Sequence, residues 1–305
     1  MIEWKKPLPE DLPLMRSLIG QSGAEGSDAN AANIFLLREK YNIKIAFAAG
    51  SLLRLYTGTR LPGRSGVTFP LGGDTEKALD ILEEDRQNLG KPARFIFLTE
   101  QQRDILARRY PEMRFETTED NSDYMYTASH LSELAGKKNM KKRNHVSRFC
   151  REYPDYEIRF LGRKPDEQLL RDITDVEEKW FALQTERVDS SFVERLEIYE
   201  ACRLWDVLEL YGAVIYVAGE AAAMTIASQT SPGCFDIHFE KCYGDYAQNG
   251  GFAMINKSFA QIIKEQFGAE WINREEDIGL AGLRKAKLSY HPDKMLRKYH
   301  TVKEG

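Results

Sequence analysis

Three ionisable side chains alternate with apolar ones in the segment 234–244, which reads CFDIHFEKCYG. Asp236, His238 and Glu240 are each separated by a single aromatic or aliphatic residue. A period of two is typical of a β-strand and predicts that these three side chains share one face. A carboxylate or an imidazole there can take a proton from an attacking amine or hydroxyl, as acyl transfer requires. The alternative is a solvated face on which His238 is merely hydrogen-bonded.

A glycine turn follows this strand and leads into a helical pattern. Gln248, Asn249, Gly250 and Gly251 precede FAMINKSFAQIIKEQF, whose apolar residues recur at helical spacing. A glycine turn at a helix N-terminus offers backbone N–H groups and the positive end of the helix dipole, which suits a phosphate. We therefore predict that these four residues bind a phosphate of the substrate that donates the transferred group. The alternative is a tight turn that binds nothing.

A second polar group lies at or just beyond the end of a strand predicted at residues 268–277. Arg284 and Lys287 are three residues apart and hence neighbours on a helix or turn. An arginine can bind a phosphate or carboxylate through two hydrogen bonds, and a lysine adds a point charge. The alternative is an internal salt-bridge network that joins Asp277 to Arg284 or Lys287. The predicted substrate-binding residues are Asn273, Arg274, Asp277, Arg284 and Lys287.

Residues 129–152 carry a cluster of positive charge in a chain whose formal net charge is -4. We expect a basic helical connector here, and its surplus of cations favours a polyanionic partner such as a phosphate, an RNA end or lipid headgroups. The alternative is an ordinary solvated helix face. Within the cluster, the predicted donor-binding residues are Lys137, Lys141 and Arg143.

Chain length and composition limit the possible classes of function. A chain of 305 residues has room for two domains, and its longest apolar runs are far shorter than a membrane span needs. The N-terminus lacks the apolar stretch of a signal peptide, which predicts cytoplasmic localisation. The four cysteines and five histidines have no metal-ligand spacing, so we expect no metal site.

The order of predicted elements repeats along the chain. A hairpin at 218–220, the strand with the ionisable residues, the glycine turn and a helix form one core. The N-terminal third has a comparable order, with a hairpin at 49–51 and helices started by Asp74 or Thr75 and by Thr99. We expect an α+β protein of two similar domains, at 1–128 and 153–305, that enclose a cleft.

The core resembles that of the GNAT superfamily of N-acetyltransferases. In that superfamily a loop written Q/R-x-x-G-x-G/A binds the pyrophosphate of acyl-CoA, and here Gln248, Gly251 and Ala253 fit the pattern. The resemblance implies acyl-CoA as a donor substrate. It also implies that Tyr290, late in the fold, serves as the acid.

Two longer segments are similar to signatures of a more specific family, the C-terminal domain of phosphatidylglycerol lysyltransferases. The first contains Tyr124, Tyr126, Leu131, Leu134, Gly136, Lys137, Lys141, Arg143 and Asn144. The second contains Asn273, Arg274, Asp277, Gly279, Gly282, Leu283, Arg284, Lys287, Ser289, Tyr290 and Pro292. This resemblance implies tandem GNAT-like domains related to the Fem aminoacyltransferases.

The resemblance also implies an activity. Relatives move an aminoacyl group from aminoacyl-tRNA to an amine or hydroxyl acceptor, so tRNA and CoA are the two expected partners. We expect a monomer or weak dimer without a tightly bound cofactor. The alternative function is a catalytically silent binding module for a nucleotide, a peptide or an anionic ligand.

Overall fold

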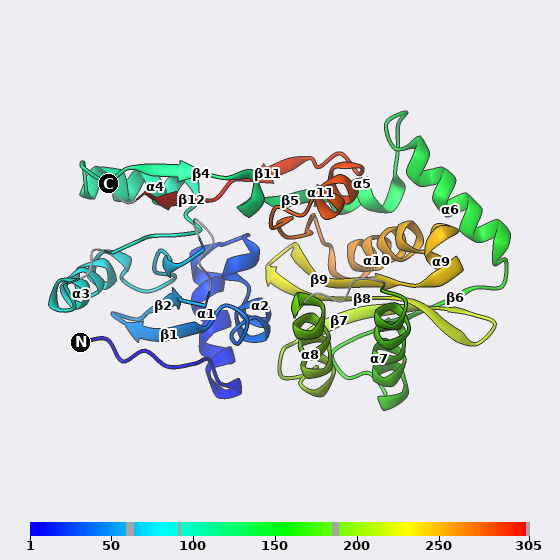
Figure 1. The fold of residues 1–305 in the computed structure, drawn as a ribbon, viewed down its shortest axis with the longest axis horizontal. Coiled ribbons are helices and arrows are strands. Elements are labelled where there is room, and N and C mark those ends of the chain that lie inside the picture. The colour runs from blue at the N-terminus through cyan, green and yellow to red at the C-terminus, as the bar shows by residue number, and fades with distance from the viewer. Residues whose placement is uncertain (59–63, 91–92, 185–188, 303–305) are drawn as a thin grey trace. The chain divides into compact units, whose positions relative to one another are not determined.

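The computed structural model describes residues 1–58, 64–90, 93–184 and 189–302, which form two compact units (Figure 1). Unit 1 comprises Met1–Tyr124, Glu275–Arg284 and the chain from Met295 onward, and unit 2 comprises Met125–Arg274 and Lys285–Lys294. The units are therefore not consecutive in sequence, unlike the expected domains 1–128 and 153–305. The basic segment 129–152, expected to be a connector, is part of unit 2.

Unit 1 contains a three-stranded antiparallel sheet in the order β1-β2-β3. β1 (Ile43–Ala48) and β2 (Ser51–Tyr56) form the predicted hairpin, whose turn residues Ala49 and Gly50 have φ of 51° and 73°. Two residues with positive φ match the twist of the flanking strands. β3 (Gly66–Val67) pairs with β2 on the other side. A separate pair joins β4 (Phe115–Thr117) to β12 (Tyr299–Thr301), which brings the end of the chain back to unit 1.

Two helices of unit 1 begin at the residues that the sequence indicates. The Asp74 side chain accepts the Lys77 N–H at the start of α3, and Thr99 forms a capping box with Gln102 at the start of α4. A core that includes Leu53, Val67, Leu79, Phe95 and Leu106 packs the two helices against the sheet. The helical elements are η1 (Pro9–Asp11), α1 (Leu12–Ser22), η2 (Ser27–Ala29), α2 (Ala31–Leu36), α3 (Thr75–Asn88), α4 (Glu100–Arg109) and η3 (Glu119–Asn121).

Unit 2 is built on a seven-stranded sheet in the order β11-β5-β10-β9-β8-β7-β6. β7 and β8 form the predicted hairpin through Ala218 and Gly219, both with positive φ. β9 and β10 are parallel, whereas β8 and β9 are antiparallel. The chain crosses between the units four times, within β5, after Arg274, after Arg284 and within β11. The strands are β5 (Asp123–Thr127), β6 (Glu157–Leu161), β7 (Leu210–Val217), β8 (Glu220–Ser231), β9 (Cys234–Cys242), β10 (Trp271–Asn273) and β11 (Lys294–Leu296).

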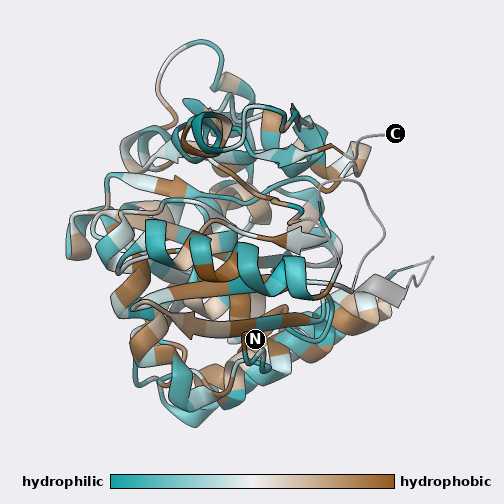
Figure 2. Ribbon diagram, turned by 90° about the vertical axis from the view of Figure 1, so that its left-hand side faces the viewer, coloured by the Kyte–Doolittle hydropathy of each residue, from teal (hydrophilic) through white to brown (hydrophobic). Residues whose placement is uncertain are grey.

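Helices cover both faces of this sheet (Figure 1). α7 (Glu167–Ala182) and α8 (Asp189–Arg203) lie on one face, and α10 (Gly251–Phe267) lies on the other. The helices carry both hydrophilic and hydrophobic residues, as expected of elements with one buried side (Figure 2). The remaining helices are α5 (Ala128–Glu133), α6 (Met140–Glu152), α9 (Gly244–Gln248) and α11 (Ala281–Leu288). Among the described residues, no helix combines the length and apolar character needed to cross a bilayer.

Candidate functional site

β9 contains a bulge that divides the three predicted catalytic residues between the two faces of the sheet. Ile226 and Ala227 of β8 pair with Phe239 and Ile237, which leaves His238 as an extra residue in β9. Phe235 packs on Phe267 of α10, with ring centroids 5.7 Å apart. Glu240 also faces α10, because Asn256 Nδ2 donates to its Oε2 over 3.1 Å. Two residues five positions apart share a face only if the alternation is interrupted between them.

The expectation that Asp236, His238 and Glu240 share one face is therefore wrong. Asp236 follows Phe235 directly and thus points away from α10. It is 0% exposed and lies opposite Ser228 in the ladder. The Ser228 Oγ is 2.8 Å from His238 Nε2, and His238 Nδ1 is 3.8 Å from Asp236 Oδ2. Asp236 and His238 accordingly form one group with Ser228, and Glu240 belongs to another.

These groups lie where β9 and β10 stop pairing. The last pair of the parallel ladder is Asp236 with Asn273, after which β10 ends and β9 continues to Cys242. Carboxyl ends of parallel strands are common places for ligand-binding residues. Asn273 itself is 0% exposed.

On the α10 face, two cations and one carboxylate surround a tyrosine ring. Arg274 Nη2 is 3.0 Å from Glu240 Oε1, and its guanidinium carbon lies 4.9 Å from the centre of the Tyr290 ring. Lys142 Nζ of α6 lies 3.7 Å from the same ring centre. Tyr290 is 4% exposed. In the described part of the chain, Arg274 Nη1 is a buried donor without a hydrogen-bond acceptor, so the cluster has unused capacity for an anion.

Burial and charge change the pKa values of this cluster. Burial and the neighbouring cations Arg274 and Lys141 together lower the pKa of Lys142 to about 8, although Glu240 opposes the change. Burial also raises the pKa of the Tyr290 phenol, so this group stays protonated near neutral pH. From the sequence, Lys142 is only one of several basic residues in segment 129–152. No local pattern could single it out, because its partner Tyr290 is far away along the chain.

The predicted donor loop is a tightly packed turn between α9 and α10. Gly250 has φ of 103°, and a Cβ on it would lie 2.2 Å from the carbonyl oxygen of His145 in α6. A Cβ on Gly251 would lie 2.4 Å from the Cys242 Sγ. Asn249 Nδ2 donates to the Tyr153 hydroxyl over 2.9 Å, and Arg148 Nη1 reaches the Gln248 carbonyl over 3.5 Å. Packing alone thus accounts for both glycines, and a role in binding phosphate stays a prediction.

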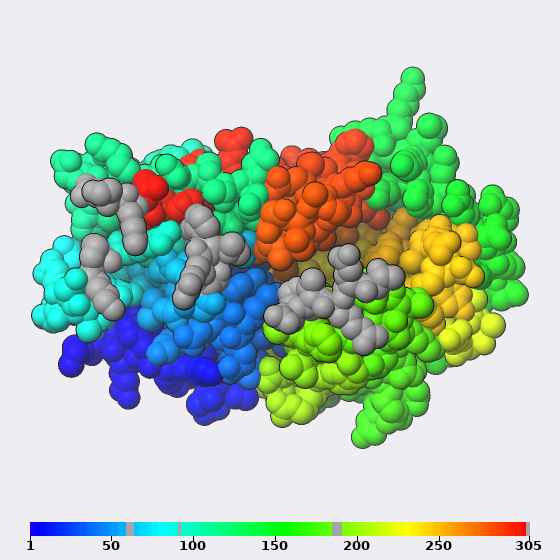
Figure 3. All heavy atoms as spheres, viewed as in Figure 1, coloured from blue at the N-terminus to red at the C-terminus, as the bar shows by residue number. Residues whose placement is uncertain are grey.

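The basic segment consists of two helices, α5 and α6, rather than one connector. Leu134, at the end of α5, has φ of 51°, and its carbonyl accepts a hydrogen bond from Arg143. Arg143 also donates to the Gly136 carbonyl over 2.6 Å, so it fixes the loop between the helices. Lys137 and Lys141 are exposed and have no ion-pair partner within the described residues. The start of α6 stands out from the surface of unit 2 (Figure 3).

Asp277 and Arg284 of the C-terminal signature form an internal salt bridge, which is the alternative that the sequence left open. Arg284 Nε and Nη2 bind the two oxygens of Asp277 over 2.7 and 2.8 Å, and Nη2 also binds Asp120 over 2.6 Å. The Tyr124 hydroxyl donates to Asp277 over 2.5 Å. All four residues belong to unit 1, whereas Arg274 and Lys287 belong to unit 2. The Lys287 side chain is buried, and its carbonyl accepts the Tyr126 hydroxyl over 2.7 Å.

Unit 1 contains buried charges that the sequence analysis did not find. Lys298 is 4% exposed and binds Asp123 over 2.6 Å and Asp28 over 3.2 Å. Arg54 is 2% exposed and pairs with Asp28 over 3.2 Å. Asp28 and Lys298 line both a cavity of about 40 Å³ and an open hollow of about 650 Å³. The sequence holds one sign of these buried charges, Arg54 within the apolar run SLLRLY. A charged residue in a buried strand needs a partner of opposite charge.

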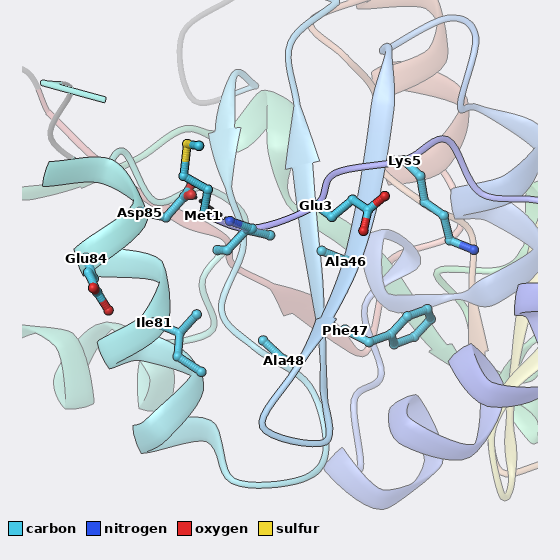
Figure 4. A pocket seen from close by; sticks show the side chains of 10 residues that line it. Met1, Glu3, Lys5, Ala46, Phe47, Ala48, Ile81, Glu84 and Asp85 are labelled. Atoms are coloured by element: carbon cyan, nitrogen blue, oxygen red, sulfur yellow. Dashed lines mark hydrogen bonds between the residues drawn. The ribbon is translucent and has the colours of Figure 1, made fainter. Parts of the chain in front are cut away.

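A further hollow of about 550 Å³ lies beside β1 and α3 in unit 1 (Figure 4). Two of the polar side chains that line it are engaged, because Asp85 accepts the Ile2 N–H over 2.7 Å and Lys5 binds Asp11 over 2.6 Å. We assign no role to this hollow.

Comparison with known proteins identifies the family. The sequence profile described as "Phosphatidylglycerol lysyltransferase, C-terminal" matches residues 20–302. The chain belongs to this family. A search of curated proteins finds no match.

Solved structures show the same fold over nearly the whole chain. A conserved protein of unknown function from Bacteroides thetaiotaomicron VPI-5482 is 30% identical, with a TM-score of 0.88 over 99% of this chain and 100% of that one. The structure named L-PGS from Bacillus licheniformis is 18% identical, with a TM-score of 0.65 over 98% and 93%. FemX is 8% identical, with a TM-score of 0.56 over 98% and 97%. The chain thus has the tandem GNAT-like α+β fold, which it shares with the L-PGS structure and, less closely, with FemX.

Proposed function

We propose that this protein is an acyltransferase that moves an aminoacyl group from aminoacyl-tRNA, or an acyl group from acyl-CoA, to an amine or hydroxyl acceptor. The observation that carries the proposal is the cluster at the separation of β9 and β10. There the cations Arg274 and Lys142 adjoin Tyr290 on one face, and His238 lies at the bulge. Both donors combine phosphate groups with a reactive carbonyl, so a cationic site and a proton acceptor are what the reaction needs.

In this proposal each residue has a separate task. The cations bind the phosphate of the donor, with the unused Nη1 of Arg274 as one donor of a hydrogen bond. His238 accepts the proton of the attacking amine or hydroxyl, and Ser228, 2.8 Å away, orients its ring. Tyr290 stays protonated and can supply a proton to the leaving group.

Aminoacyl-tRNA is the donor that we favour. The family, and the exposed cations Lys137 before α6 and Lys141 in its first turn, support a polyanion larger than a single phosphate. Acyl-CoA is the competing donor, supported by the match of Gln248, Gly251 and Ala253 to the superfamily loop. The close packing of Gly250 and Gly251 gives that loop a structural explanation as well, which weakens the argument for CoA.

One observation favours a binding module without catalysis. Two of the candidate bases already have a partner, because His238 contacts Ser228 and Glu240 binds both Arg274 and Asn256. A site whose bases are engaged in this way can hold a nucleotide, a peptide or another anionic ligand without transferring a group.

A transfer assay with labelled donors separates these functions. The protein is incubated with aminoacyl-tRNAs or acyl-CoAs carrying isotopic label, with a bacterial small-molecule and lipid extract as acceptor, and products are followed by mass spectrometry. Transfer that depends on the protein supports the acyltransferase and identifies its donor. Thermal stabilisation by a donor without transfer, under the same conditions, would support the binding module.

A further inference from the structure

We propose that Lys142 is a site of covalent acylation by small activated acyl donors, such as acyl phosphates and acyl thioesters. This inference does not depend on the proposed transferase function. It rests on the position of the amine in α6, on the groups around it and on its accessibility.

The Lys142 amine is held in place without an anionic partner. Its Nζ contacts the Tyr290 ring at 3.7 Å, and no hydrogen bond or ion pair involves it within the described residues. The nearby carboxylate, Glu240, is occupied by Arg274 and by Asn256. The lysine is partly exposed, so a small electrophile can reach it.

The surroundings favour the neutral, nucleophilic form of the amine. Arg274 and Lys141 lower the pKa of Lys142 in addition to its burial, and Glu240 only partly compensates for them, which leaves a value of about 8. His145, one turn further along α6, in turn has a pKa lowered by burial and by Lys142. Desolvation and a neighbouring cation are two ways in which proteins activate a lysine as a nucleophile.

The expected gain in rate follows from these values. At pH 7.5, a pKa of about 8 leaves roughly a quarter of the amine neutral, against about 0.1% for an ordinary lysine. A less basic nucleophile is intrinsically slower, which offsets part of this advantage. We expect a net acceleration of roughly tenfold over an exposed lysine.

The reaction is an attack of the Lys142 amine on the acyl group of the donor. The neutral Nζ attacks the acyl carbonyl, a C–N bond forms, and the bond from the carbonyl carbon to phosphate oxygen or thiol sulfur breaks. Phosphate or thiolate leaves, and the proton of the amine passes to solvent. The product amide is uncharged, so acylation removes one of the two cations at the Tyr290 ring and weakens the site for anions.

Acetyl phosphate provides the test on the unmodified, folded protein. Acetylation of each lysine is followed by peptide mass spectrometry between pH 6.5 and 9.5, with exposed Lys141 and Lys137 as internal controls. We expect Lys142 to react about tenfold faster than Lys141 at pH 7.5, with a rate that levels off above pH 8. A rate no greater than that of Lys141, or one that still rises at pH 9.5, would overturn the proposal.

A variant separates the role of the neighbouring charge. Arg274→Gln removes the positive charge beside the amine, so the levelling-off of the Lys142 rate should shift to higher pH. Arg159→Gln changes an arginine whose guanidinium lies over Tyr216 instead and should leave the Lys142 rate unchanged. An equal effect of both substitutions on the Lys142 profile would contradict activation by Arg274.

Discussion

Arg274 and Glu240 form an ion pair 3.0 Å long between side chains that are only 12% and 10% exposed. Glu240 lies on β9, and Arg274 directly follows β10, beyond the last ladder pair of Asp236 and Asn273. The ion pair therefore connects the two segments where backbone pairing has ended. This position gives the pair a structural role as well as a place in the candidate site.

Breaking this ion pair should destabilise the protein. Arg274→Met leaves the Glu240 carboxylate buried without its cation, and we expect a loss of about 3 kcal/mol in the free energy of unfolding. Removing both charges in Arg274→Met/Glu240→Met should restore a large part of that loss, because no unpaired charge remains. Denaturant unfolding of both variants measures the difference. If the double variant is less stable than the single one, the uncompensated charge is not the cause.

Gly250 should be intolerant of a side chain for a reason of packing. Gly250→Ala brings a Cβ to within 2.2 Å of the His145 carbonyl at a φ of 103°, so helix α6 or the turn must move. Gly219→Ala is the matched control, since it also has positive φ, 81°, but open space around it. We expect about 1 kcal/mol lost at Gly219 and roughly 2 kcal/mol more at Gly250, measured by denaturant unfolding. Equal losses would show that the contact with α6 is unimportant.

Local sequence signals predicted much of the fold correctly. The hairpin turns at Ala49-Gly50 and Ala218-Gly219 adopt positive φ, and Asp74 and Thr99 start their helices. Each depends on residues within a few positions of one another, where turn and capping preferences act. The tandem GNAT-like fold was predicted from the resemblance to the family signatures, because periodicity alone does not reveal it.

Features that depend on distant parts of the chain could not be predicted in this way. The bulge at His238 arises from the register of β9 on β8, while the sequence itself continues to alternate. The cluster of Lys142, Tyr290 and Arg274 joins three segments that no local pattern relates. The same applies to Lys298, which meets Asp123 and Asp28 only in the folded unit 1.

Glu177 should make the stability of the protein depend on pH. It is 0% exposed, its carboxylate oxygens have no hydrogen-bond donor within the described residues, and Lys241 Nζ is 3.9 Å away. Burial raises the pKa of Glu177 to about 7. The native state therefore holds a proton that the unfolded state releases, so the stability from this group is complete below about pH 4.5 and is lost as the pH rises through about 7.

Glu177→Gln removes this titration. The variant should be more stable than the parent by up to about 3 kcal/mol at pH 8 and close to it at pH 5. Unfolding by denaturant at several pH values measures the effect. Glu194→Gln serves as the control, because Glu194 is 33% exposed and binds the same Lys241 over 3.0 Å. A parallel pH profile for parent and Glu177→Gln would show that Glu177 is ionised throughout.

The exposed cations of the α6 region should govern binding of tRNA. Lys137→Gln and Lys141→Gln should each weaken binding and reduce the slope of log affinity against log salt by about 1, as expected for one phosphate contact. Lys264→Gln is the control, since Lys264 is already paired with Glu133 over 2.8 Å. Fluorescence anisotropy with labelled aminoacyl-tRNA at several salt concentrations measures both quantities. Unchanged slopes for the first two variants would exclude these lysines from the contact.

His238 should be the residue on which turnover depends most. If His238 takes the proton of the attacking amine or hydroxyl, His238→Ala lowers kcat by about 10² to 10⁴-fold. Ser228→Ala removes only a contact 2.8 Å from the His238 ring and should have a smaller effect. Donor affinity should change little in either variant, because neither substitution removes Arg274 or Lys142, the cations that bind phosphate. The measurement is single-turnover transfer with the donor identified by mass spectrometry, across a range of pH. Undiminished turnover in His238→Ala would exclude it as the base, and Glu240→Ala, measured in parallel, would then decide whether the carboxylate on the α10 face acts instead.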